Sequence, residues 1–453
     1  MRRIRIQDTL SGERLALEPR EPPKVGIYAC GPTVYGRVHV GNARPFVVFA
    51  LLRRFLEREG YEPTLVVNVT DVNDKIYDAA REAGVPSEQL AREMTAAYVR
   101  DTDALGLGRP DHEPLASEAI EGIVGLISDL VERGHAYPAG GDVYFRVPSF
   151  PAYGKLSNRP LEEMQQGEND DEAELKENAH DFALWKAHKE GEDTAWGSPW
   201  GKGRPGWHIE CSAMAEALLG TDFEIHGGGS DLVFPHHENE IAQTEAAHDR
   251  PLARVWMHNG MVRFEGEKMA KSVGNIAQLH EALDQYGAQT LVMYFAGGHY
   301  HQPLAFSSDE LDDARGAVAT LRELVRRLDP EAAEPEGFDE HAERFWDHLA
   351  DDFNTPAARG VLFEWVREAN RRLGRGEKVG AGALRELLWA LGLESLFEAE
   401  ETADAEAEGM MAEREEAREA RDFERADRLR DELAARGWQV RDTPEGPQLV
   451  PLG

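Results

Sequence analysis

The sequence predicts an α/β protein: a parallel-sheet domain with an insertion, then an all-α helical bundle and a small C-terminal domain. Three observations predict it. A strand, a glycine-rich loop, a helix and a second strand follow one another near the N-terminus, amphipathic helices fill the stretch after residue 307, and a charged helix and a short β-like piece end the chain. The 453 residues suggest about three domains at roughly 150 residues each.

The first sheet elements lie within residues 24–69. Residues 25–30 form a short apolar run typical of a strand, residues 41–59 show helical periodicity, and residues 64–69 are again β-rich. This βαβ unit predicts a Rossmann-type parallel sheet with a right-handed crossover. Nucleotide sites in such sheets lie at the carboxyl ends of the strands.

The rest of the sequence divides into four parts. The first domain comprises residues 1–307, and we predict that residues 110–206 are an insertion in it. The insertion contains a helical segment, a hairpin region and an acidic stretch (EEMQQGENDDEAELKEN) that we expect to be mobile. Residues 308–398 predict a helical bundle. The acidic run 398–408 is typical of a linker, and residues 409–453 predict a small C-terminal domain that begins with one charged helix.

Composition excludes several classes of protein. The formal net charge is −34, and 10 Lys and 40 Arg are set against 84 acidic residues. Because phosphate contacts need Lys and Arg, a non-specific nucleic-acid binder is a poor match. Such an acidic, Lys-poor chain resembles proteins from salt-loving organisms and predicts tolerance of, or need for, high salt. The sequence has no run of about 18 apolar residues and no secretory signal, and only two cysteines, so we expect a cytoplasmic protein without a membrane segment.

Two short motifs carry nucleotide chemistry. His39-Val40-Gly41-Asn42 lies where the first helix begins, and a helix N-terminus offers free N–H groups to a phosphate, although a plain strand-to-helix turn fits equally well. The second motif is Lys268-Met269-Ala270-Lys271-Ser272, whose two lysines can offset charge that builds up during phosphoryl displacement. A solvated basic loop is the alternative.

A third set of side chains has metal-binding chemistry. Glu240 follows His236 by four residues on a predicted helix, so both face one side, and Cys30 and Cys211 supply thiols. Zinc takes Cys, His and carboxylate ligands. The residues alone favour a disulfide or two buried thiols over a metal.

Together these motifs resemble the class I aminoacyl-tRNA synthetases and, within them, closely the cysteinyl-tRNA synthetase family. The HIGH signature of that class appears as HVGN and its KMSKS signature as KMAKS. The segments YACGPTVYGRVHVGNARPFVVF, NVTDVNDKI, GWHIECSAM, FEIHGGGSDLVFPHHENEIAQ and DDFNTPAARGVLF are similar to text of that family, from about Lys24 to Leu449. One departure is Ala270, where the family usually has Ser.

The resemblance implies specific site residues. It implies one Zn²⁺ held by Cys30, Cys211, His236 and Glu240. It implies that ATP, with Mg²⁺, is bound by His39, Gly41, Asn42, Lys268, Lys271 and Ser272. Of these, His39, Asn42, Lys268 and Lys271 are expected to be catalytic, with Lys271 foremost in transition-state stabilisation. It places Gly31, Thr70, Trp207 and Asp231 in the amino-acid pocket, with His226 and His237 nearby.

The resemblance also implies a reaction and partners. ATP would activate L-cysteine to cysteinyl-adenylate, which is then transferred to the terminal adenosine of tRNA(Cys), with zinc selecting the thiol over the hydroxyl of serine. A monomer is expected, with tRNA contacts from a local basic patch that includes the bundle arginines Arg367, Arg371, Arg372 and Arg375. Two alternatives stay open: a ligase of the same core that joins cysteine to an amino-sugar, and an inactive paralogue that only binds tRNA or metal.

Overall fold

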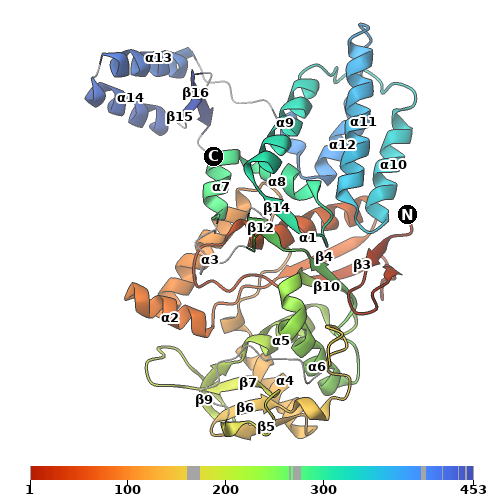
Figure 1. Ribbon diagram of the computed structural model, residues 1–453, viewed down its shortest axis with the longest axis vertical. Coiled ribbons are helices and arrows are strands. Elements are labelled where there is room, and N and C mark those ends of the chain that lie inside the picture. Colours follow the sequence, from red (N-terminus) through yellow and green to blue (C-terminus); the bar gives the residue numbers. More distant parts are fainter. Residues whose placement is uncertain are drawn as a thin grey trace. The chain divides into compact units, whose positions relative to one another are not determined.

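The computed structural model, drawn in Figure 1, consists of two compact units, Met1–Glu394 and Ser395–Gly453. The described residues are 2–160, 174–264, 267–268, 277–398, 405–420, 422–436, 438–443 and 446–451. Lys271, Ser272 and most of the acidic stretch that we expected to be mobile lie outside these residues. Among the described residues, no helix combines the length and apolarity needed to cross a membrane.

A four-stranded parallel sheet forms the centre of the first unit, in the order β11-β10-β3-β4. Its strands are β3 (Lys24–Ala29), β4 (Glu62–Val67), β10 (Phe223–Gly229) and β11 (Ala253–Asn259). The chain runs from β3 to β4 on one side and from β10 to β11 on the other. The carboxyl ends of β3 and β10 therefore form the topological switch point, where open α/β sheets bind ligands. The predicted Rossmann-type fold class is confirmed.

Helix α1 (Val40–Arg58) connects β3 to β4 and lies one residue N-terminal to the predicted range. Its apolar residues Phe46, Phe49, Leu52 and Phe55 are buried, which explains why this helix is fixed against the sheet. At its start, Asn42 Oδ1 accepts a hydrogen bond from the backbone N–H of His39 at 3.3 Å.

The inserted segment forms an antiparallel five-stranded sheet in the order β5-β6-β7-β9-β8. Its elements are α4 (Ile120–Glu132), β5 (Ala136–Ala139), β6 (Asp142–Phe145), β7 (Phe182–Ala187), β8 (Trp196–Ser198) and β9 (Gly201–Pro205). Its apolar core, around Ile123, Phe145 and Trp185, also includes Ile209 of α5 (Trp207–Leu219) and Ala242 of α6 (Glu238–His248). Because α5 and α6 serve both sheets, the insertion is built onto the helices that carry the candidate site.

Further helices complete the first unit, and α9 to α12 form the predicted bundle (Figure 1). The helices are α2 (Asp74–Ala83), α3 (Ser87–Asp103), α7 (Leu279–Tyr286), α8 (Ala288–Gly297), α9 (Ser308–Val325), α10 (Phe338–Ala350), α11 (Thr355–Leu373) and α12 (Gly382–Ala390). Small sheets are formed by β1 (Arg5–Gln7) with β2 (Arg14–Ala16), and by β12 (Val262–Phe264) with β13 (Glu267–Lys268) and β14 (Leu304–Phe306).

The second unit has two helices, α13 (Ala405–Glu419) and α14 (Phe423–Ala435), and a hairpin of β15 (Trp438–Thr443) and β16 (Gly446–Pro451). The prediction of one charged helix was wrong, because Asp422 starts a new helix by accepting a hydrogen bond from Arg425 N at 3.1 Å. The predicted linker also ends earlier than residue 408, since α13 begins at Ala405.

Candidate metal centre and nucleotide site

The four predicted metal ligands come together at the switch point of the central sheet. Cys30 directly follows β3, Cys211 lies on α5, His236 lies in a short turn (Val233–His237) after β10, and Glu240 lies in the first turn of α6. All four are buried, and their ligand atoms lie within 4.8 Å of one another. The helix begins after His236 and not before it, but the turn still places both side chains on the same side.

The spacing of these atoms suits a tetrahedral zinc ion. Cys30 Sγ lies 3.6 Å from Glu240 Oε1, and His236 Nε2 lies 3.1 Å from the same oxygen. With zinc–sulfur bonds of about 2.3 Å and zinc–nitrogen or zinc–oxygen bonds of about 2.0 Å, two ligands of one tetrahedral ion are about 3.3–3.5 Å apart. The donor set and its spacing therefore fit zinc.

A second set of four donors overlaps the first. His226 and His237 share Cys30 and Glu240 with it, and these four ligand atoms also lie within 4.8 Å of one another. His226 Nε2 lies 2.8 Å from Glu240 Oε2, and His237 Nε2 lies 3.3 Å from Cys30 Sγ. Both imidazoles thus contact atoms of the predicted ligands.

Two further histidines of this cluster were missed by the sequence analysis. His208 Nδ1 lies 2.9 Å from His236 Nδ1, and His258 Nε2 lies 2.7 Å from His237 Nδ1. His208 precedes Cys211 by three residues on a helix, which places both on one face and was a usable signal. His258 sits near the carboxyl end of β11, beside the strand that leads to the site.

Both cysteines are free thiols, so the disulfide alternative is wrong. Burial raises the pKa of Cys30 well above its ordinary value. Burial also acts to raise the pKa of Cys211, but its hydrogen bond with Cys30 and the charge of His236 lower that pKa to about 6. Burial acts to lower the pKa of His236, but the charges of Glu240 and Cys211 outweigh it and raise the pKa. The cluster therefore favours a thiolate at Cys211.

Gly31 and Thr70 lie at the adjoining ends of β3 and β4. A Cβ atom on Gly31 would stand 1.8 Å from the carbonyl oxygen of Asn68, so no larger residue fits there without moving the backbone. The buried Thr70 donates from Oγ1 to Glu210 Oε2 at 3.2 Å. Glu210, which the sequence analysis did not single out, is itself buried beside Cys211, and burial raises its pKa well above the ordinary value.

Trp207 and Asp231 approach the cluster from its outer side. The Trp207 ring stacks on His236, with the ring centroids 4.3 Å apart. Asp231 is exposed and lies between β10 and the turn that carries His236, and its charge helps to raise the pKa of His236. Both residues are therefore near the predicted metal ligands.

The HVGN segment is joined to the chain that follows the KMAKS motif. Val40 N donates to Ala277 O at 2.9 Å, and Leu279 N donates to Val38 O at 3.0 Å. Gly41 lies against the His39 ring, 2.8 Å from where a Cβ would be. The backbone of Lys268 belongs to β13, whereas Lys271 and Ser272 lie outside the described residues. The structure thus places residues 277–279, which follow the KMAKS motif in the chain, beside the HVGN segment.

One turn further along α1, Arg44 is buried. Its guanidinium donates to the carbonyl oxygens of Gly260 at 2.6 Å and His299 at 2.9 Å. These bonds connect α1 to the residue after β11 and to the turn after α8. Burial lowers the pKa of Arg44 to about 10, so it stays charged at neutral pH.

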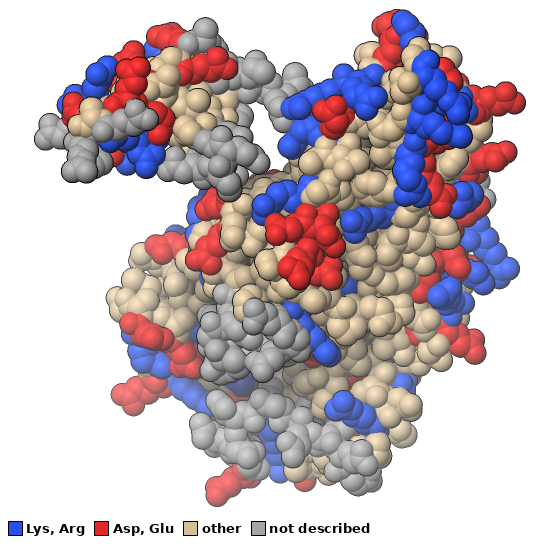
Figure 2. Space-filling view, turned by 45° about the horizontal axis from the view of Figure 1, so that its top comes forward, with Lys and Arg blue, Asp and Glu red and all other residues tan. Residues whose placement is uncertain are grey.

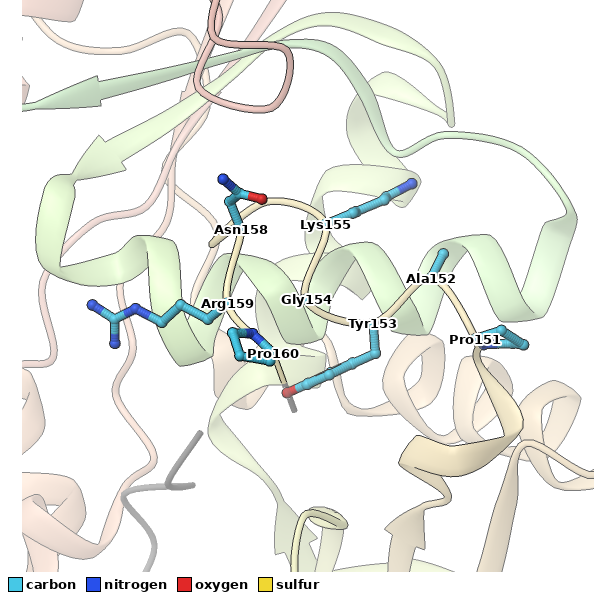
Figure 3. A pocket seen from close by; sticks show the side chains of 8 residues that line it. All are labelled: Pro151, Ala152, Tyr153, Gly154, Lys155, Asn158, Arg159 and Pro160. Carbon is cyan, nitrogen blue, oxygen red and sulfur yellow. The ribbon is translucent and has the colours of Figure 1, made fainter. Parts of the chain in front are cut away.

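The loop of residues 151–160 lines a hollow of about 440 Å³ in the inserted subdomain (Figure 3). Gly154 N and Ser157 N donate to the buried carboxylate of Glu238 at 3.0 and 2.8 Å, and Lys155 pairs with Glu245 at 2.6 Å. Figure 3 shows Lys155 and Arg159 pointing to opposite sides of the loop. The loop is therefore anchored on α6, the helix that carries Glu240.

Models of three protein domains match the chain in succession. They are the tRNA synthetases class I (C) catalytic domain over residues 16–316, the DALR domain over residues 344–394 and the Cysteinyl-tRNA ligase anticodon binding domain over residues 401–448. The chain is 48% identical to a cysteine–tRNA ligase of Halorhodospira halophila and 45% identical to one of Symbiobacterium thermophilum. Each match covers 98% of this chain and of the relative.

Solved structures agree on the fold. A methionyl-tRNA synthetase of Mycobacterium tuberculosis in complex with methionyl-adenylate matches with a TM-score of 0.59 at 16% identity, over 81% of this chain and 88% of that one. An Agrobacterium radiobacter LeuRS in a ternary complex matches with a TM-score of 0.59 at 11% identity, over 84% of each chain. On the strength of the near full-length relatives and the catalytic-domain model, the chain belongs to the cysteine–tRNA ligase family of class I aminoacyl-tRNA synthetases.

Proposed function

We propose that this protein activates L-cysteine with ATP and transfers it to the terminal adenosine of tRNA(Cys). The observation that carries the proposal is the buried set of two thiols, an imidazole and a carboxylate at the carboxyl ends of β3 and β10. The cysteine–tRNA ligase relatives span the whole chain, so the same reaction is the simplest assignment.

Cys30, Cys211, His236 and Glu240 would hold one Zn²⁺. When bound, the zinc supplies a preference for a thiolate donor. This preference distinguishes cysteine from serine, two near-isosteres that an ordinary pocket separates poorly.

The residues around the metal ligands shape the pocket. His226 orients Glu240 through the 2.8 Å contact, and the Trp207 ring covers His236. Gly31 and Thr70 line the floor beside Cys30, and Asp231 faces the outer side. The proposed amino-acid pocket thus consists of Gly31, Thr70, Trp207 and Asp231.

The chain would bind ATP, with Mg²⁺, at the N-terminus of α1. The positive end of the helix dipole suits phosphates, and His39 adds a polar side chain at the same place. Lys268, Lys271 and Ser272 would approach the phosphates from the KMAKS segment. In support, Ala277 and Leu279, further along the chain, are hydrogen-bonded to Val40 and Val38, in and beside HVGN. The cysteine carboxylate attacks the α-phosphate and pyrophosphate leaves, with the two lysines offsetting the developing charge.

We assign the domains to parts of this task. Residues 1–307 form the catalytic domain, in which the insertion at about 110–206 receives the acceptor end. Residues 308–398 face the tRNA stem, and residues 409–453 read the anticodon side. Figure 2 shows Lys and Arg gathered in a band over the helical bundle, although the whole chain is acidic. Arg367, Arg371 and Arg375 are exposed and suit phosphate contacts. Glu368 pairs with Arg371 and, at 2.8 Å, with the half-buried Arg372.

We further propose that the protein works in the cytoplasm as a monomer. Free buried thiols suit a reducing compartment.

The test is cysteine-dependent ATP–pyrophosphate exchange, then charging of tRNA(Cys), with zinc measured on the same sample at high salt. Exchange, charging and stoichiometric zinc at the thiol site support the proposal. Exchange without charging would favour ligation of cysteine to another acceptor, such as an amino-sugar. A folded, zinc-loaded protein without exchange would contradict the enzymatic proposal and leave a binding protein.

A further inference from the structure

A second group of metal-binding side chains lies away from the thiol cluster. His299 and His301 are in the turn between α8 and β14, and Asp352 is in the loop between α10 and α11. Their ligand atoms lie within 4.8 Å of one another. The group therefore sits where the catalytic body meets the helical bundle, beside the N-terminal β1–β2 hairpin.

Asp352 is fully buried, and its two carboxylate oxygens differ. Oδ1 accepts hydrogen bonds from Gln7 N at 2.8 Å and from the Tyr300 hydroxyl at 2.7 Å. Oδ2 has no hydrogen-bond partner, although the side chain has 0% exposure. A buried carboxylate oxygen without a donor is costly, so this atom points to a ligand.

Three nitrogen atoms surround Oδ2 beyond good hydrogen-bond distance. His299 Nε2 lies at 3.6 Å, His301 Nε2 at 3.7 Å and Arg14 Nε at 3.5 Å. The two imidazole distances are close to the separation of about 3.3 Å expected between nitrogen and oxygen ligands of one tetrahedral zinc ion. His301 is one-third exposed, with 33% of its side chain accessible, so an ion can enter from solvent.

We propose that His299, His301 and Asp352 bind one divalent transition-metal ion, with Zn²⁺ as the best-suited ion. Two imidazoles and a carboxylate are a common donor set for such ions and leave a fourth position for water. The bound ion would join the turn before β14 to the loop before α11 and so brace the bundle against the catalytic body. Arg14 competes with it for Asp352 Oδ2, which makes the site weaker than the thiol cluster.

The test uses the full-length protein and counts zinc by equilibrium dialysis. We expect two zinc ions per wild-type chain, one bound tightly and one more weakly, and one per chain in His301→Gln. The matched control is His112→Gln, because His112 is exposed and remote in sequence from the site, and it should keep both ions. One zinc in the wild type, or two in His301→Gln, would overturn the proposal.

Cobalt(II) distinguishes the two sites in the same samples. A thiolate site gives a sulfur-to-cobalt band in the near ultraviolet, whereas the second site has only nitrogen and oxygen donors and adds weak visible bands alone. His301→Gln should lose the added visible bands and keep both the thiolate band and pyrophosphate exchange. If the proposed function is wrong, the wild-type protein itself will show no cysteine-dependent pyrophosphate exchange, whatever its zinc content.

Arg14→Gln guards against a purely structural effect. It removes the competing cation and keeps every ligand, so the weaker site should bind zinc several-fold more tightly. Loss of the second ion in this variant, as in His301→Gln, would contradict the proposal, because the surrounding fold and not the three ligands would then decide binding.

Discussion

Gly31→Ala tests whether the close packing of β3 against β4 holds the site in shape. The added Cβ would stand 1.8 Å from Asn68 O, and reaching the 3.0 Å that real Cβ atoms keep requires a displacement of about 1.2 Å. The two nearest atoms, the carbonyl oxygen and carbon of Asn68, are backbone, so one strand end must move, and Cys30 is the residue next to Gly31. A displacement of about 1 Å costs about 100-fold in rate, which equals about 2.7 kcal/mol in the barrier, and overpacking adds ~1–3 kcal/mol of instability.

The assay pairs urea unfolding with cysteine-dependent pyrophosphate exchange. Gly125→Ala is the matched control, because Gly125 is exposed on α4 with nothing within 4 Å of the position that an added methyl group would take, and helical alanine stabilises by about 0.5–1 kcal/mol. We expect Gly31→Ala to lose both stability and exchange, and the control to lose neither. Wild-type exchange and stability in Gly31→Ala would refute the reasoning, since the strand ends would then have room that the structure denies them.

Three further predictions follow. In Cys30→Ser, zinc content and cysteine affinity should fall together, by at least the roughly 10–100-fold that losing an outer partner costs, and normal cysteine binding in a zinc-free sample would contradict this. Burial acts to raise the pKa of Asp74, but Arg204 and Lys186 lower it overall, so Asp74→Asn should lower the free energy of unfolding at neutral pH. That deficit should shrink as the pH falls below about 4, through the folded pKa of Asp74, and a deficit independent of pH in urea titrations would argue against the ion pairs. Asp422→Ala should cost about 1 kcal/mol at the start of α14, and unchanged hydrogen exchange in that helix would show that the cap is unimportant.

Local patterns predicted the parts of the fold that depend on neighbouring residues. The strand, loop, helix and strand of residues 24–69 follow from apolar runs and glycine placement, and α1 begins within one residue of its predicted start. The inserted sheet could be predicted only as a hairpin, because β8 and β9 are short and rich in glycine. The break at Asp422 was missed because charged residues continue helical periodicity across it.

The candidate site depended on contacts across the chain. Cys30 and Glu240 are 210 residues apart, and no spacing rule brings them together, so resemblance to a family had to supply the ligand set. His258 comes from a different strand than either motif and had no local signal. Lys271 and Ser272 remain predictions from sequence. The His299 and Asp352 group also joins distant segments, which is why only three-dimensional structure reveals it.

Buried Arg44 has a consequence for the proposed nucleotide site at high ionic strength. At 1 M salt the Debye length is about 3 Å, so exposed arginines attract phosphate only at short range. The same screening weakens the repulsion between the net charge of −34 and an anionic substrate. Arg44 is 1% exposed and is held by two carbonyl oxygens, so counterions do not reach it. At the N-terminus of α1, where we propose that ATP binds, this buried charge adds to the positive end of the helix dipole without an ion pair that salt could exchange.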